Sequence, residues 1–169
     1  MSESDSAAFI LPGPTAASDV AHVLRQYFVE AGAPFDGDFV VFNDVGEQEK
    51  DPVDVSSEEA GWQQLLAWPG LGGLTYLVAH KRVSVFLHGA DAHRVDYVIL
   101  SVRSYLPGDE VERAFHRVTE QLHERLHAAR SIVKYMILDG SFPMGEEVER
   151  VRSGVFAGEY EKDLRQPPR

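Results

Sequence analysis

Residues 74–104 read LTYLVAHKRVSVFLHGADAHRVDYVILSVRS, and this stretch decides the fold. Leu74, Tyr76 and Val78 alternate with Thr75 and Ala79, and after a short turn apolar residues again occupy every second position, at Val83, Val85 and Leu87. Such alternation is typical of a half-buried strand. A third apolar segment, residues 95–102, follows a turn at residues 89–92. Because connections this short join only antiparallel neighbours, the stretch predicts a three-stranded antiparallel meander.

Two further strands are expected outside the meander. Phe39-Val-Val-Phe42 is rich in β-branched and aromatic residues and follows an expected turn at Asp36-Gly37. Residues 132–138 have the same character. They bring the expected sheet to about five strands.

Helical spacing of apolar residues predicts helices before, within and after this sheet. The first covers residues 18–30, with Gly32 placed to end it, and Ser56 with Glu59 matches a capping box for a short second helix. Asp109 is placed to cap the longest helix, which we expect to run to about Ala129 with a buried face of Val111, Phe115, Val118, Leu122 and Leu126. A short helix is expected at residues 146–152. The pattern predicts an α+β fold, with the long helix packed on one face of the antiparallel sheet and shorter helices flanking it.

The ends of the chain are expected to be flexible. Leu11-Pro-Gly-Pro14 favours neither a helix nor the interior of a sheet, so residues 1–15 are interpreted as a flexible tail. Residues 159–169, which end in Gln166-Pro-Pro-Arg169, are interpreted as a second tail. One α+β domain is expected between them, at residues 16–158, because a chain of 169 residues has the ordinary size of a single domain.

Composition excludes several functions. There is no cysteine, and therefore no disulfide framework, thiolate nucleophile or cysteine-based metal site. A net charge of -11 opposes binding to nucleic acid, which normally requires a basic surface. Apolar runs are strand-sized, so no membrane span is expected, and the acidic start of the chain does not resemble a signal peptide. We expect a cytoplasmic protein.

Acidic residues are concentrated in residues 44–59, which contain seven of them against the single Lys50. Such a segment is suited to a basic protein partner. Two tryptophans follow closely, and partly exposed tryptophans are frequent anchors at protein interfaces. The sequence therefore predicts a partner-binding surface made of Asp44, Glu47, Glu49, Asp51, Asp54, Trp62 and Trp68.

The run His123-Glu124-Arg125-Leu126-His127 resembles the motif of the zincin metallohydrolases. The resemblance implies zinc ligation by His123 and His127, with Glu124 as the general base. It covers five residues, and zincins favour a bulky apolar residue where this chain has Arg125. On a helix, His116, Glu120, His123 and His127 would form one stripe, which is a surface to test for metal binding or a response to pH.

Three functions follow from these patterns. A non-enzymatic protein-binding module without a cofactor is favoured over an enzyme, and its size and charge are similar to those of small acidic immunity proteins and of secretion chaperones or adaptors. A zinc-dependent hydrolase using the motif is the alternative. A small-molecule sensor with a pocket between the sheet and the long helix is the second alternative.

Overall fold

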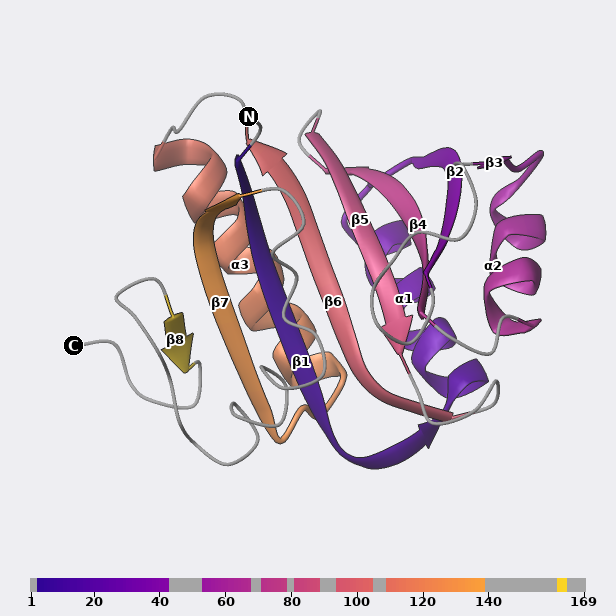
Figure 1. Ribbon diagram of the computed structural model, residues 1–169, viewed down its shortest axis with the longest axis horizontal. Coiled ribbons are helices and arrows are strands. Elements are labelled where there is room, and N and C mark those ends of the chain that lie inside the picture. Colours follow the sequence, from indigo (N-terminus) through magenta and orange to yellow (C-terminus); the bar gives the residue numbers. More distant parts are fainter. Residues whose placement is uncertain are drawn as a thin grey trace.

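The computed structural model describes residues 3–42, 53–67, 71–78, 81–88, 94–104, 109–138 and 161–163 (Figure 1). These residues form an α+β fold whose strands belong to one antiparallel sheet, in the order β3-β2-β4-β5-β6-β1-β7-β8. The strands are β1 (Glu3–Ala16), β2 (Phe35–Phe42), β3 (Val53–Asp54), β4 (Leu71–Val78), β5 (Lys81–His88), β6 (Arg94–Ser104), β7 (Arg130–Leu138) and β8 (Glu161–Asp163). The helices are α1 (Ala17–Glu30), α2 (Glu58–Ala67) and α3 (Asp109–Arg125). The predicted α+β class and antiparallel sheet are confirmed.

The meander forms as predicted, from β4, β5 and β6. Leu74 lies opposite Val85, and Val85 lies opposite Leu100 on its other side. All three residues are fully buried, so the alternation in the sequence marks the face that packs in the core. The described part of the sheet has eight strands, against the expected five or so, because β1, β3 and β8 were not foreseen.

Helices α1 and α3 lie behind the sheet in Figure 1, while α2 lies beside its β2–β3 end. Both long helices contribute to one core cluster, through Leu24 and Phe28 of α1 and Phe115 and Leu122 of α3. None of the described helices is long and apolar enough to cross a membrane.

The prediction of a flexible tail at residues 1–15 is wrong for residues 3–15, which belong to β1. Strand β1 lies between β6 and β7, and residues 7–10 are at most 1% exposed. Its prolines are tolerated because they fall where the ladder is interrupted: pairing with β7 stops at Ile10, and pairing with β6 resumes only at Thr15. A missing N–H therefore costs no ladder hydrogen bond at Pro12 or Pro14.

Other boundaries also differ from those predicted. Strand β8 falls within the predicted tail at residues 159–169 and pairs with β7. Asp36-Gly37 is not a turn but part of an irregularity inside β2, where Gly37 has a φ of 90°. The hydroxyl of Ser57, rather than that of Ser56, accepts the N–H of Ala60 at the start of α2. The helix expected at residues 146–152 lies outside the described residues.

Candidate functional site

One acidic residue of the predicted partner-binding surface lies in the described part of the sheet. Asp44, Glu47, Glu49, Asp51 and Trp68 lie outside the described residues, whereas Asp54 belongs to β3, the outermost strand. Asp54 is the register partner of Asp38 on β2. Residues directly opposite each other in an antiparallel pair have Cβ atoms about 4.5–5.5 Å apart, and like charges there are destabilising. Asp38 was not part of the predicted surface, because its position opposite Asp54 depends on the pairing register of β2 and β3.

Two acidic residues at the end of the segment have an internal partner. Arg25 of α1 bonds through Nη2 to Glu59 Oε2 at 2.7 Å, and its Nε lies 3.4 Å from Glu58 Oε1. The hydrogen bond to Glu59 raises the pKa of Arg25. Arg25 thus links α2 to α1, and its single positive charge offsets one of the two negative charges of Glu58 and Glu59.

Trp62 lies in the core, which contradicts its predicted role as a partner anchor. It is 1% exposed, and its Nε1–H donates to the hydroxyl of Tyr76 at 2.8 Å. That hydroxyl donates in turn to Glu58 Oε1 at 3.0 Å, and burial raises the pKa of Tyr76. The apolar face of α2 packs so closely on the sheet that a Cβ at Gly61 would lie 2.9 Å from Leu74 Cδ2.

The His-Glu-Arg-Leu-His run is not a continuous helix. Helix α3 ends at Arg125 rather than near Ala129, and His127 has a φ of 51°. The N–H of Ala128 donates to the His123 carbonyl and the N–H of His127 to the Glu124 carbonyl, both at 3.1 Å, which is the Schellman arrangement. His127 therefore lies beyond the helical spacing that the zincin motif needs.

The predicted histidine stripe divides into separate parts. His116 Nε2 lies 2.7 Å from Glu120 Oε1, as their spacing predicts. His123 Nδ1 instead lies 2.6 Å from the hydroxyl of the buried Ser131 on β7. Among the residues that the structure describes, no three histidine, aspartate or glutamate side chains are grouped so as to hold a metal ion.

We expect His127→Gly to raise the free energy of unfolding by roughly 0.5 to 1 kcal/mol, because glycine adopts a positive φ without the steric cost of a Cβ. Urea denaturation measures the change. The matched control, His22→Gly at an exposed position within α1, should have the opposite sign. A loss of stability in His127→Gly would contradict this view of the helix end.

An ion pair between α3 and α1 gives a pH dependence. Arg125 pairs with Glu30 and lies over the ring of Tyr27, 5.5 Å from its centroid. The hydrogen bond from Arg125 lowers the pKa of Glu30 below its ordinary value of 4.5. A carboxyl whose pKa is lower in the folded chain than in the unfolded chain stabilises the fold at a pH above its unfolded-state pKa. This stabilisation is lost as the pH falls through its folded-state pKa. We therefore expect wild type to lose more stability than Glu30→Gln below about pH 4.5. Thermal denaturation across that pH range measures the difference. Parallel dependences of stability on pH in the two proteins would contradict a role for this ion pair.

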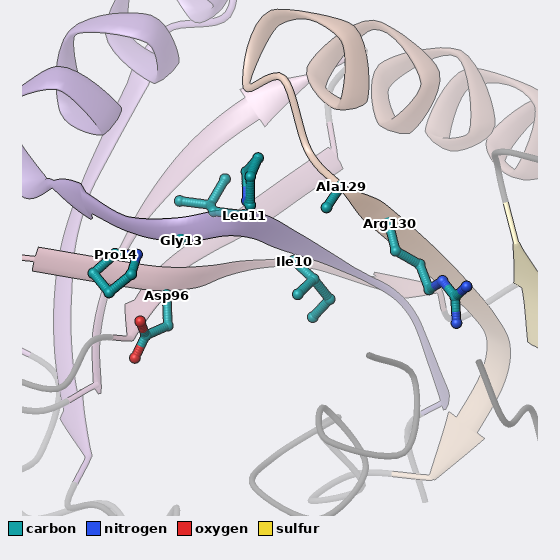
Figure 2. A pocket seen from close by; sticks show the side chains of 8 residues that line it. Ile10, Leu11, Gly13, Pro14, Asp96, Ala129 and Arg130 are labelled. Atoms are coloured by element: carbon teal, nitrogen blue, oxygen red, sulfur yellow. The ribbon is translucent and has the colours of Figure 1, made fainter. Parts of the chain in front are cut away.

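One hollow was missed entirely at the level of sequence. It has a volume of about 260 Å³ and is lined by residues 10–14, Asp96, Ala129 and Arg130 (Figure 2). It lies where β1 departs from both neighbouring strands. The sequence did contain a signal for it, because Pro-Gly-Pro next to an apolar run can mark a bulge that interrupts a strand. Bulges are frequent near binding sites.

Comparisons with known proteins assign no family. No family model matches the chain, and no curated protein matches it. Among solved structures, the chain is similar to the Pseudomonas aeruginosa T6SS protein PA0821, with 11% sequence identity and a TM-score of 0.41. The likeness covers 83% of this chain and 42% of that one, so the chain spans less than half the length of the protein it resembles.

Proposed function

We propose that this protein is a non-enzymatic binding module, of the small acidic immunity or chaperone and adaptor kind, that engages a basic protein partner. The observation that carries the proposal is the register of the outermost strands, which places Asp38 opposite Asp54. Like charges at directly opposite register positions of an antiparallel pair cost stability, and a lysine or arginine of a partner would remove that cost.

The surrounding charge supports the same partner. Of the seven acidic residues in residues 44–59, Glu58 and Glu59 are paired with Arg25. The other five, Asp44, Glu47, Glu49, Asp51 and Asp54, carry the proposed surface together with Asp38. In a chain of net charge -11, they would attract a basic surface and accelerate its association. Trp62 is not part of this surface, and Trp68 is kept as a proposed contact.

The edge pair has a consequence for stability that is independent of any partner. We expect Asp54→Lys to raise the free energy of unfolding by about 0.2 to 1 kcal/mol, because an opposite-charge pair replaces a like-charge pair. Urea denaturation measures it, and Asp19→Lys, at an exposed position of α1, is the control with the same change of charge. Equal changes in the two variants would mean that net charge rather than the Asp38–Asp54 pairing is responsible.

Partner capture tests the function. The wild-type chain is used to isolate a partner, and its dissociation constant is then measured for two double variants with the same change of charge. Asp38→Lys with Asp54→Lys should weaken binding by about tenfold or more, because like charges then face each other across the interface. Asp19→Lys with Glu124→Lys, at exposed helix positions, should leave it unchanged. Equal affinities in the two double variants would contradict the proposal.

A further inference from the structure

The hollow beside β1 arises from a mismatch in strand length. Between the pairs Ile10↔Tyr97 and Thr15↔Val95, β1 has four residues where β6 has the single residue Asp96. On the other side, pairing with β7 ends at Ile10↔Arg130. The segment Leu11-Pro-Gly-Pro14 therefore bows away from both neighbours, and Asp96 lines the space that it leaves.

The polar groups around this space are a carboxylate at Asp96, a guanidinium at Arg130 and the backbone of the bulged segment. Pro12 and Pro14 have carbonyl oxygens but no N–H, so the four residues of the bulged segment have four backbone acceptors and two backbone donors, at Leu11 and Gly13. The side chain of Thr15 donates to the Gly13 carbonyl at 3.1 Å. Asp96, which is half-buried, adds a carboxylate. A ligand with a positive charge would donate hydrogen bonds to the Asp96 carboxylate and balance its charge.

Apart from Arg130, the remaining walls are apolar. Figure 2 shows Ile10 between Asp96 at one end of the hollow and Arg130 at the other. Arg130 is not without a partner, because it takes part in an interaction within the chain. The volume of about 260 Å³ is below the roughly 300 to 1,000 Å³ of sites for drug-sized ligands, so it suits a single extended side chain or a small amine.

We propose that the hollow beside β1 binds an ammonium or guanidinium group on an aliphatic stem, with Asp96 as its counter-ion and Ile10 and the prolines against the stem. The site does not depend on the proposed acidic edge. Strands β1 and β3 are five strand spacings apart in the sheet, a distance of roughly 24 Å.

A titration followed by amide NMR tests the site. The probes are Nα-acetyl-arginine amide and its uncharged counterpart Nα-acetyl-citrulline amide. The arginine probe should give saturable shifts at the amides of Gly13, Asp96 and Ala129, and the citrulline probe should give none. Asp96→Asn should weaken binding of the arginine probe at least about tenfold, and Asp96→Glu should retain binding. Melting temperatures establish that each variant is folded.

Three control variants establish that the carboxylate of Asp96, and no other charge, holds the probe. Two of them should bind the arginine probe as wild type does: Glu124→Gln, which removes an exposed carboxylate elsewhere, and the Asp38→Lys with Asp54→Lys variant. Because the second changes the proposed acidic edge but not the hollow, failure of the cation site and failure of the proposed function are distinguishable. Arg130→Gln should bind it at least as well as wild type. The proposal is overturned if the wild type gives no saturable shift, if citrulline matches arginine, or if Arg130→Gln loses binding while Asp96→Asn keeps it.

The proposed ligand, a cationic group on an aliphatic stem, could come from a free amine or from a side chain of a protein. Spermidine and a blocked peptide with a single arginine are compared under the same conditions. Tighter binding of spermidine identifies a free polyamine as the ligand, and tighter binding of the peptide identifies a protein side chain. Absence of binding by both overturns the proposal.

Discussion

Replacing Trp62 by alanine should lower the free energy of unfolding by about 3 to 5 kcal/mol, the range found when large aromatic side chains are removed from cores. Trp62 is 1% exposed and holds the hydroxyl of Tyr76. The ring of Tyr76 stacks on Phe28 of α1, with centroids 4.0 Å apart. Removal of the indole therefore leaves a cavity between α2 and the sheet and one hydrogen bond fewer on Tyr76. Urea denaturation measures the loss.

Two controls separate the causes. Trp62→Phe keeps most of the volume but removes the indole donor, and it should cost roughly 1 to 2 kcal/mol. Val29→Ala changes an apolar side chain that is 72% exposed and should have an effect within about 0.5 kcal/mol. A loss of less than about 1 kcal/mol in Trp62→Ala would mean that the indole is not in the core.

The second large effect is expected at Gly73, in β4, the first strand of the meander. A Cβ there would lie 2.4 Å from Cδ1 of Phe86 on β5 and 3.0 Å from the carbonyl oxygen of Val85. The ring of Phe86 is itself buried, so it has little room to move. Gly73→Ala should therefore cost about 1 to 3 kcal/mol, measured by urea denaturation.

Gly13→Ala is the matched control, since a Cβ at Gly13 meets no atom within 4 Å. Combining Gly73→Ala with Phe86→Ala should cost less than the sum of the two single changes, because the smaller side chain removes the clash. Strict additivity, or equal costs at Gly73 and Gly13, would refute the close packing of glycine on the aromatic ring.

The meander could be predicted because its signals are local. Alternation at Leu74, Tyr76 and the following strand depends on which face of one strand is buried, and short turns leave antiparallel pairing as the one solution. Helix α1 was equally clear, because Gly32 occupies the position with a positive φ, 66°, at its end. Helix α3 ends in the same way with His127 instead of glycine, and this gave no signal in the sequence.

Strand β1 was missed for a different reason. Its apolar run, residues 7–11, is in plain view, but Pro12 and Pro14 argued against a strand. Their acceptability depends on where β6 and β7 stop pairing, and the residues of those strands that pair with β1 lie about eighty residues or more away in the chain. Long-range pairing of this kind is not encoded in any local window.

The candidate surface was predicted in part. Counting charges located the acidic segment, but composition does not show which acidic residues are already paired. The ion pairs of Arg25 with Glu58 and Glu59, and the position of Asp38 opposite Asp54, depend on tertiary contacts. These contacts give Glu58 and Glu59 a partner within the chain and add Asp38, which was not predicted.

The most direct test of the acidic edge is the rate at which its partner associates. Rate constants are measured at low and at physiological ionic strength for wild type and for the two double variants, Asp38→Lys with Asp54→Lys and Asp19→Lys with Glu124→Lys. For wild type and the helix variant, the rate should fall about tenfold or more as salt is added, and the edge variant should be slow and nearly insensitive to salt. A wild-type rate that does not change with ionic strength, or equal rates for the two variants, would contradict a basic partner at this edge.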